Sequence, residues 1–594
     1  MRFGCRFLTG GRVCDTHIYK YGAYPFDLIG PITVIWQSQS DKMHTPPGPS
    51  TRHRAKHQKK EQAAPIPETP KRMVWIRAHP SVFSEVYKAL QTSTSYALEA
   101  AKKSNESAAE VDLVVEISDL RERLNIFEIM GPKSSQIIKG ALKPTLQSRK
   151  EFTAFWQSLG NLQTTASLPR NMVIGFTVND PRLTFPPKNA HVQTNLTSSP
   201  VAGIFPTSLL ALSDIWAEEV RDKLQKPKFK KKDLDQRRSQ SDNPGTSLQS
   251  TLHDDRIPVL LIQRSLESSP DGAPSGSSSQ LDSPSLHGWT LVIPSGWSMP
   301  FFSSLIYTGT RVAGQRERQT QAFEAGKPYF PRDYPACKEY QQYSDDREEK
   351  ESERWQKKPP AKRPNYQVLL TRSPWQPDWD VVLGLQPPPP MDLPAKTSAD
   401  FVETQRHQAK DMKPWLLRGP NVGRILEAAS TMFNHAAGLH EEINKLRTKR
   451  LLDPLPASVR ADNLWKTALI TVKLRMCGRG RPEDLAMIYI VDDEEHGQWT
   501  ASFNKDAMLT DDQEDQLELA NRQMHTDNII GYVTTGNFSL SLGEAYAIGA
   551  VPLARLFELK EQATRMGKYP HLLVKVRDRG ETVYRAAHLE VIEG

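Results

Sequence analysis

Four stretches without an apolar period divide the chain and limit where folded units can form. Residues 46–72 and 221–240 are basic and contain Pro, Gln and Ser, residues 266–285 are rich in Ser, Pro and Gly, and residues 387–390 are consecutive prolines. Such compositions bury too little apolar surface to offset the conformational entropy lost on ordering. We therefore expect several folded units, separated by disordered stretches, within the 594 residues.

The two basic stretches carry more positive charge than the chain as a whole. Seven Lys and Arg against two Glu give residues 46–72 a charge of +5, nine against three Asp give residues 221–240 a charge of +6, and the chain's net charge is +8. Each stretch is predicted to be a flexible arm, and nucleic acid is the partner class that this charge favours. Taken alone, the same runs fit a solvated linker or a nuclear-import signal equally well.

Cysteine spacing and hydropathy argue against metal-binding and membrane classes. The four cysteines show no CxxC spacing, so we expect no zinc module, no other metal site and no disulfide scaffold. No apolar run approaches the roughly 18 residues that a membrane-spanning helix needs, and the first residues lack the apolar core of a signal peptide. We expect that the chain has no membrane partner. We also expect it in a reducing compartment, the nucleus or the cytosol.

Between the breaks, apolar patterning predicts strands and helices. Residues 73–104 read as a strand followed by a helix that begins at Pro80, and residues 111–142 as a strand pair followed by a helix. Residues 460–594 hold short strands separated by glycines and charges, which suit a β-barrel or a sandwich. The whole pattern predicts an α+β, multidomain protein.

Residues 287–337 carry the most distinctive pattern, a PSGW turn followed by glycine-punctuated aromatics and an FPRDYPAC turn. This stretch resembles the POPLD module in the large "processing of precursors" protein subunit of eukaryotic ribonuclease P and ribonuclease MRP. The positions in register are Pro294, Gly296, Trp297, Tyr307, Gly309, Arg311, Gly314, Arg316, Phe330, Pro331, Asp333, Tyr334, Pro335 and Cys337. Ala336 stands where the family commonly has an acidic residue.

Other segments resemble further blocks of this family in the same order. They are residues 24–37, 73–83, 175–187, 257–264, 475–489 and 530–551, the last containing Gly531 and Gly536. The family's basic-aromatic WHAKRFHM-like motif is absent, so the resemblance implies a chain truncated at its N-terminus. The order of strands, with residues 130–140 near the start and residues 530–551 near the end, also resembles the fold of the glycine-cleavage T-protein. This second resemblance implies a T-protein-like core with a C-terminal β-barrel, interrupted by disordered basic and Ser/Pro-rich insertions.

The resemblance and the compositional breaks together divide the chain into units. The expected units are a remnant of the family's N-terminal domain (1–45), a basic linker (46–72), an α+β core (73–220), a basic disordered arm (221–255), a core strand (256–265), a Ser/Pro-rich linker (266–286), a POPLD-like module (287–385), a Pro-rich spacer (386–410) and a β-rich, barrel-like domain (411–594).

Arginines and lysines beside glycines and aromatics are the candidate RNA contacts, because RNA binding needs cations for phosphates and planar groups for unpaired bases. The candidates are Arg52, Arg54, Lys56, Lys59, Lys60, Lys228, Lys230, Lys231, Lys232, Arg237, Arg238, Arg311, Arg316, Arg332, Arg475, Arg479 and Arg481. For Arg311 and Arg316, internal ion pairing fits as well as RNA contact. For the arginines of the loop RMCGRGRPED, solubility of a hairpin is an adequate alternative.

Other positions of the family pattern are expected to serve the fold. Trp297, Phe301 and Phe302 are predicted to fill a core. Asp180 is predicted to cap the turn before Pro181, since no His or metal cluster lies nearby to make it a general base.

Searches for enzymatic signatures (GxSxG, a P-loop, HExxH, GxGxxG, a paired DxD) find none, which lowers the expectation of an enzyme. The resemblance implies a non-catalytic, RNA-binding scaffold without a cofactor, in a ribonucleoprotein whose RNA is the catalyst. It implies tRNA 5′-leader removal and pre-rRNA processing in the nucleus and nucleolus. The implied partners are the ribonuclease P and MRP noncoding RNA, precursor tRNA and rRNA, and smaller protein subunits. A folate-binding aminomethyltransferase-like enzyme and a pure protein-interaction scaffold remain alternatives.

Overall fold

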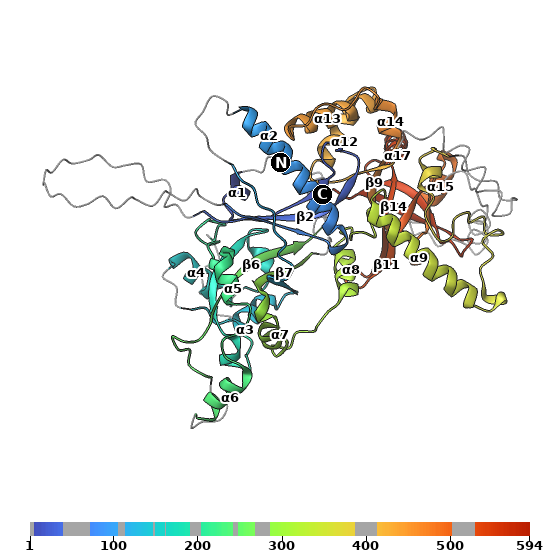
Figure 1. The fold of residues 1–594 in the computed structure, drawn as a ribbon. Helices are drawn as coiled ribbons and strands as arrows, with labels where there is room; N and C mark the ends of the chain where they lie inside the picture. The colour runs from blue at the N-terminus through green and yellow to red at the C-terminus, as the bar shows by residue number, and fades with distance from the viewer. Residues whose placement is uncertain are drawn as a thin grey trace.

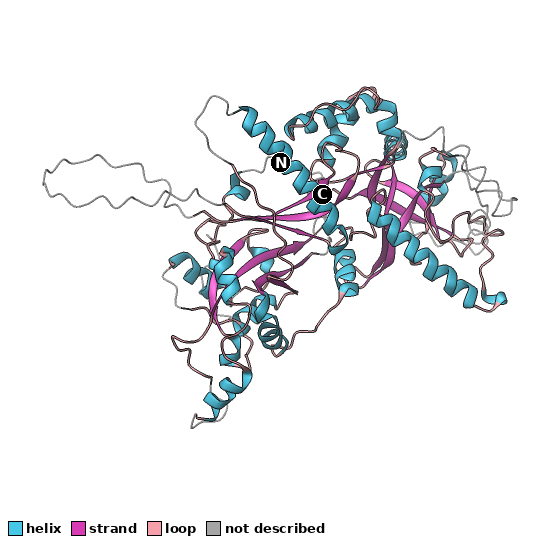
Figure 2. Cartoon of the chain, in the orientation of Figure 1, coloured by secondary structure: helices cyan, strands magenta, loops and turns pink. Residues whose placement is uncertain are grey.

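The computed structural model describes residues 5–39, 72–104, 113–145, 149–160, 162–190, 204–240, 247–267, 285–386, 413–501 and 529–593. These residues form an α+β fold with a four-stranded sheet, a three-stranded sheet and a closed barrel (Figures 1 and 2). No helix among them is both long enough and apolar enough to cross a membrane.

The four-stranded sheet is antiparallel, with the order β4-β7-β6-β5. Its strands are β4 (Leu124–Met130), β5 (Val173–Asn179), β6 (Arg256–Leu266) and β7 (Leu286–Pro294). The two central strands, β6 and β7, carry buried apolar side chains on both faces of the sheet. This pattern is expected for strands whose two faces are both covered by other elements. One face packs on helices α3 (Ser134–Ala141), α4 (Lys150–Ser158) and α7 (Ser298–Ile306). On the other face, Leu260 and Val292 share a core with Ile35 and Trp75 of the three-stranded sheet.

The three-stranded sheet joins two segments that were expected to belong to different units, residues 1–45 and residues 73–220. Its strands are β1 (Cys14–Tyr19), β2 (Leu28–Trp36) and β3 (Val74–Ala78), in the order β1-β2-β3. The short helix α1 (Cys5–Leu8) precedes β1. After β3, His79 caps the turn that Pro80 begins, and α2 (Phe83–Ser104) follows as predicted. The Trp75 ring stacks on Trp216, with ring centroids 3.9 Å apart. This contact joins β3 to the part of the molecule that contains the four-stranded sheet.

The C-terminal strands close into a six-membered ring, so the barrel prediction is confirmed. The ring order is β12-β11-β10-β13-β14-β9, and β12 pairs with β9 to close it. The strands are β9 (Ala468–Met476), β10 (Met487–Ile490), β11 (Ile529–Ser539), β12 (Glu544–Pro552), β13 (Leu572–Arg577) and β14 (Tyr584–Val591). A short strand, β8 (Trp415–Leu417), adds to β9 in parallel.

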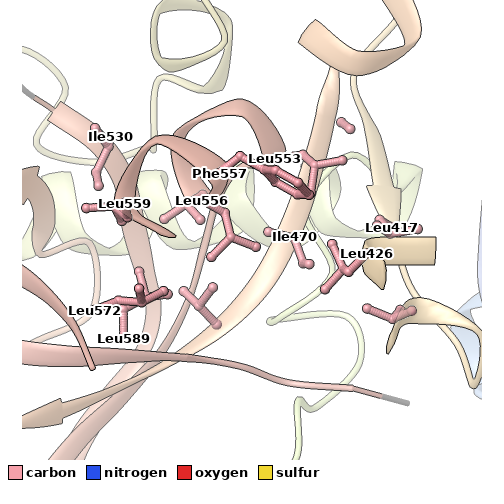
Figure 3. Close-up of a cluster of buried hydrophobic side chains, with 14 of the residues drawn as sticks. Leu417, Leu426, Ile470, Ile530, Leu553, Leu556, Phe557, Leu559, Leu572 and Leu589 are labelled. Carbon is pink, nitrogen blue, oxygen red and sulfur yellow. The ribbon is translucent and has the colours of Figure 1, made fainter. Parts of the chain in front are cut away.

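Leucine, isoleucine and phenylalanine side chains fill the space between the barrel and its covering helices (Figure 3). The helices are α12 (Val422–Thr431), α13 (His435–Lys449), α14 (Ala461–Lys466) and α17 (Leu553–Arg565), and α15 (Asp493–Ala501) follows β10. Leu426 of α12, Leu556 of α17 and Ile470 of β9 all belong to this core. Helix α17 begins directly after β12, with Pro552 at its N-cap, so the strand and the helix that covers it are continuous.

Residues 285–386 run from the four-stranded sheet to the barrel (Figure 1). After β7 and α7 come α8 (Gln315–Glu324), α9 (Lys338–Lys357) and α10 (Trp379–Val382). Trp379 packs edge-on against Tyr532 of β11, with ring centroids 5.5 Å apart. This segment therefore connects the two halves of the molecule.

The predicted disordered arm over 221–255 is wrong for the described part of that range. Helix α5 (Glu218–Lys223) enters it, and α6 (Lys231–Ser239) lies within it. Leu234 is 1% exposed, and Arg237 pairs with Asp254 at 2.6 Å. One apolar anchor and one ion pair order the segment, and neither produces a periodic pattern in the sequence.

Other predictions about order have mixed outcomes. Residues 113–123 form no strand, so the expected strand pair over 111–142 is the single strand β4 followed by α3. The expectations for residues 46–71, 268–284 and 387–410 fall outside the described residues.

Candidate nucleic-acid interface

The FPRDYPAC turn between α8 and α9 docks on barrel strand β11 through one buried carboxylate. Asp333 is 2% exposed and accepts hydrogen bonds from the hydroxyls of Thr534 at 2.5 Å and Thr535 at 2.7 Å. The backbone N–H of Tyr329 donates to its other oxygen at 2.8 Å. Burial raises the pKa of Asp333 above its ordinary value, against the opposing effects of Arg332 and these donors. The motif is thus a structural junction.

Arg332, a candidate RNA contact, lies inside this junction. Its guanidinium pairs with Asp484, and its Nε donates to the carbonyl of Thr534 at 3.2 Å. The side chain is 18% exposed, so the arginine is used for an internal contact in this structure.

Glycines of the family pattern occur where two backbones approach closely. A Cβ at Gly536 would lie 2.4 Å from the carbonyl oxygen of Pro482, and one at Gly296 would lie 2.1 Å from that of Gln225. Trp297, next to Gly296, is fully buried, and so is Phe301, which confirms their predicted place in the core, whereas Phe302 is half-buried. Asp180 accepts a hydrogen bond from the backbone N–H of Arg182 at 2.9 Å and caps the turn, as predicted.

Three arginines surround a single carboxylate where β3, β4, β6 and α8 meet. Glu128 pairs with Arg77 at 2.6 Å and with Arg264 and Arg318 at 3.1 Å each. Burial alone would raise the pKa of Glu128, but the arginines outweigh it and hold the pKa below its ordinary value. The cluster keeps a formal excess of two positive charges. Sequence reasoning missed it because its members lie on four separate elements with no shared motif.

The candidate cations of residues 228–238 divide into paired and unpaired groups. Arg237 and Arg238 form ion pairs of 2.6 Å with Asp254 and Asp235, and Lys228 donates to the carbonyl of His253 at 3.1 Å. The unpaired group is exposed and has no ion pair within the described residues. Its members are Lys230, Lys231 and Lys232, at the start of α6.

The remaining candidates lie apart from one another. Arg311 and Arg316 are exposed, and the described part of the chain holds no ion pair for either of them. Arg475 lies on β9 rather than in the loop that follows, and it pairs with Glu544 at 3.0 Å. In that loop Arg479 is exposed, and Arg481 lies 4.0 Å from Glu483. The five candidates of the 46–72 stretch, from Arg52 to Lys60, fall outside the described residues.

Metal-binding geometry is not found in the described ranges. No three His, Cys, Asp or Glu side chains there are grouped in a way that could hold an ion.

Comparison with known proteins places two domains on these elements. Residues 288–379 match the POPLD (NUC188) domain, which covers most of β7 and extends through α9 to the start of α10. Residues 468–523 and 500–593 match the POP1 C-terminal domain, which covers the barrel. The buried Asp333 contact therefore lies between the two matched domains.

Three curated relatives are similar to the chain at low identity. "Ribonucleases P/MRP protein subunit POP1" of Homo sapiens is 24% identical over 460 residues, which are 63% of this chain and 42% of the relative. The protein of the same name from Arabidopsis thaliana is 23% identical over 417 residues, 63% of this chain and 45% of the relative. The Schizosaccharomyces pombe protein is 22% identical over 271 residues, 45% of this chain and 28% of the relative.

The chain thus spans less than half the length of the curated relatives that it matches. The order of the matched domains agrees with the resemblance inferred from the motifs of residues 287–337 and 530–551. The chain thus matches a POPLD domain followed by a POP1 C-terminal domain, and over part of its length it is similar to ribonucleases P/MRP protein subunits of three organisms.

Proposed function

We propose that this chain is a non-catalytic, RNA-binding scaffold subunit of ribonuclease P and ribonuclease MRP. In this role it supports removal of the 5′ leader from precursor tRNA and the processing of precursor rRNA. The names of its relatives supply the complexes. The observation that carries RNA binding is the group of exposed, unpaired lysines at the start of α6.

The position of these lysines on the helix favours an anionic ligand. Lys231 and Lys232 are the first two residues of α6, and Lys230 precedes them. Asp233 in the first turn accepts a hydrogen bond from the N–H of Lys230 at 2.8 Å and offsets part of the positive charge of this helix end, but three lysines outnumber it and repel one another. A phosphate bound at this end would reduce that repulsion.

The helix holds these charges on an ordered element. Leu234 is buried, and the Arg237–Asp254 pair fixes the following turn. Figure 1 shows α6 on the side of the four-stranded sheet away from the barrel, where a large polyanion has access. Because the helix is ordered before binding, less conformational entropy is lost when a ligand binds.

The proposal includes the partners and the location. The noncoding RNA of the two ribonucleases is the direct ligand, precursor tRNA and rRNA are reached through the complex, and smaller protein subunits dock on the remaining surface. The site of action is the nucleus and nucleolus. The likeness of the strand order between residues 130–140 and 530–551 to the glycine-cleavage T-protein stays a prediction about architecture, without that protein's folate chemistry.

The test is a binding titration of the full chain with a structured ribonuclease P RNA at several salt concentrations. If about six phosphates are neutralised, the affinity falls roughly a thousandfold between about 50 and 200 mM salt. Charge reversal of Lys230, Lys231 and Lys232 to Glu lowers the affinity and flattens the salt slope. Reversal of the exposed Lys350, Lys358 and Lys362, in and just after α9, is the matched control and leaves both unchanged.

Other outcomes favour the alternatives. A flat salt response of the parent chain favours a scaffold that binds only proteins. Folate binding at micromolar concentration in calorimetry favours an aminomethyltransferase-like enzyme. Equal RNA affinity of the charge-reversed and parent proteins contradicts the role of α6.

A further inference from the structure

A cavity of about 290 Å³ lies where α8 meets β11, beside the Asp333 junction. Its lining includes Arg316, Gln319, Phe323, Tyr329, Asn537 and Phe538. The volume is close to the lower end of small-ligand pockets, about 300 Å³. The cavity is therefore large enough for a single small ring system and its polar substituents.

Contacts behind the cavity hold its walls in place. The hydroxyl of Ser539 and the backbone N–H of Leu540 donate to the Glu324 carboxylate at 2.5 and 3.1 Å, which ties the end of β11 to α8. Phe323 stacks on Tyr546 of β12 with centroids 4.2 Å apart. The opposite side is held by Asp333 and Thr535. Because these walls are fixed from both domains, the cavity exists before a ligand binds.

Polar groups at the rim have unused bonding capacity. Asn537 is exposed, and its side-chain oxygen accepts from the N–H of Phe538 at 2.9 Å, while its amide NH2 has no acceptor among the described residues. Gln319 forms no side-chain hydrogen bond, and Arg316 no ion pair, within the same described ranges. Phe538 is 44% exposed at this rim.

We propose that the cavity accepts one unpaired base of the bound RNA, and this inference rests on the proposed RNA-binding function. A flat aromatic surface at Phe538 stacks on the base, and the amides of Gln319 and Asn537 offer donors and an acceptor to its edges. Arg316 lies where it can meet the adjoining phosphate, because its guanidinium is exposed at the rim. Single-stranded bulges and loops present bases in this way, whereas paired helices do not.

The test uses two hairpin RNAs that differ by one base. The first carries a single unpaired adenosine, and the second has an abasic site at the same position, so length and phosphate charge are equal. The full chain is expected to bind the first at least about fivefold more tightly, as the stacking of one base on an aromatic side chain implies. Replacing the adenosine with 2-aminopurine gives a fluorescence change on stacking in the cavity.

Two variants of the cavity and one control show whether the unpaired base binds in this cavity. Phe538→Ala removes the stacking surface, and Gln319→Trp fills the cavity from α8 without changing β11; both reduce the ratio of affinities to about one. Phe433→Ala removes a fully exposed phenylalanine outside the cavity and keeps the parent ratio. Thermal melting of each variant shows that it is folded.

The outcomes separate this inference from the function on which it rests. Equal affinity of the parent for the two hairpins, with strong salt dependence, overturns the base pocket and leaves RNA binding intact. Loss of copurifying protein subunits in Phe538→Ala, again with equal hairpin affinities, assigns the cavity to a protein side chain instead. Failure of the parent to bind any hairpin overturns the proposed function together with the pocket.

Discussion

The carboxylate of Asp333 accepts a 2.7 Å hydrogen bond from the hydroxyl of Thr535, across 202 residues of sequence. Asp333 lies in the turn between α8 and α9, and Thr535 lies on barrel strand β11. Because Thr534 donates to the same carboxylate, a single buried acidic group joins the POPLD domain to the POP1 C-terminal domain. The two domains are thus packed together at this contact.

Asp333→Ala is expected to lower the free energy of unfolding by about 2 to 4 kcal/mol, because the buried hydroxyl of Thr535 and the N–H of Tyr329 would lose their acceptor. Urea-induced unfolding of the full chain measures the loss. Asp346→Ala, an exposed change on α9, is the control and stays within about 0.5 kcal/mol of the parent. If the two variants are equally stable, the junction contributes nothing.

Glu128→Gln is expected to destabilise the protein by about 2 to 3 kcal/mol. The substitution leaves the guanidinium groups of Arg77, Arg264 and Arg318 facing one another in a partly buried site without a counter-charge. Added salt should recover part of the loss, because counter-ions screen the repulsion between the arginines. Thermal unfolding at low and high salt measures both effects.

The matched control for this cluster is Glu317→Gln, at an exposed position near the start of α8. It removes the same charge without opening an arginine cluster, so its stability should follow the parent at both salt concentrations. A Glu128→Gln protein with parental stability at low salt would show that the three arginines do not need the carboxylate.

Local patterns predicted those parts of the fold whose information lies in neighbouring residues. The short apolar segments of residues 460–594, separated by glycines and charges, predicted a barrel or sandwich, and the strands close into a barrel. Pro80 predicted the start of a helix, and Asp180 a capped turn, because each acts on residues beside it in the chain.

Contacts between distant residues could not be predicted in the same way. The Glu128 cluster draws its members from four elements, and no spacing rule relates Arg77 to Arg318. The order of α6 depends on the single apolar residue Leu234 and on Asp254, whereas composition counts only the lysines around them. Arg332 was predicted to contact RNA, but it pairs with Asp484 instead. The sequence could not predict this pair, because it forms only when the barrel is folded beside the turn that carries Arg332.

Trp297→Ala is expected to cost about 3 to 5 kcal/mol of stability, since the indole, at the N-cap of α7, is fully buried and its removal leaves a cavity. RNA affinity of the folded fraction should be unchanged, which separates this residue from the lysines of α6. Met299→Ala, two residues further on and 67% exposed, is the control. Lower RNA affinity at a temperature where Trp297→Ala is fully folded would contradict a purely structural role.

His17 is expected to make stability depend on pH between about 3 and 6.5. Its Nδ1 is shielded from solvent without a hydrogen-bond partner in the described structure, and its Nε2 lies 3.5 Å from the hydroxyl of Tyr334. Burial, followed by the charge of Arg418, lowers the pKa of His17 from 6.5 to about 3. The unfolded chain therefore takes up a proton at a higher pH than the folded chain does.

The sign of the effect follows from this difference. The contribution of neutral His17 is complete above about pH 6.5 and is lost as the pH falls toward about 3, by at most about 1.4 kcal/mol per pH unit. His17→Gln cannot titrate, so the parent should lose stability relative to this variant over that range, as measured by urea unfolding at each pH. His253→Gln, at an exposed histidine, is the matched control and should follow the parent. A constant difference between the parent and His17→Gln from pH 7 to pH 4 would mean that the imidazole can be charged inside the fold without cost.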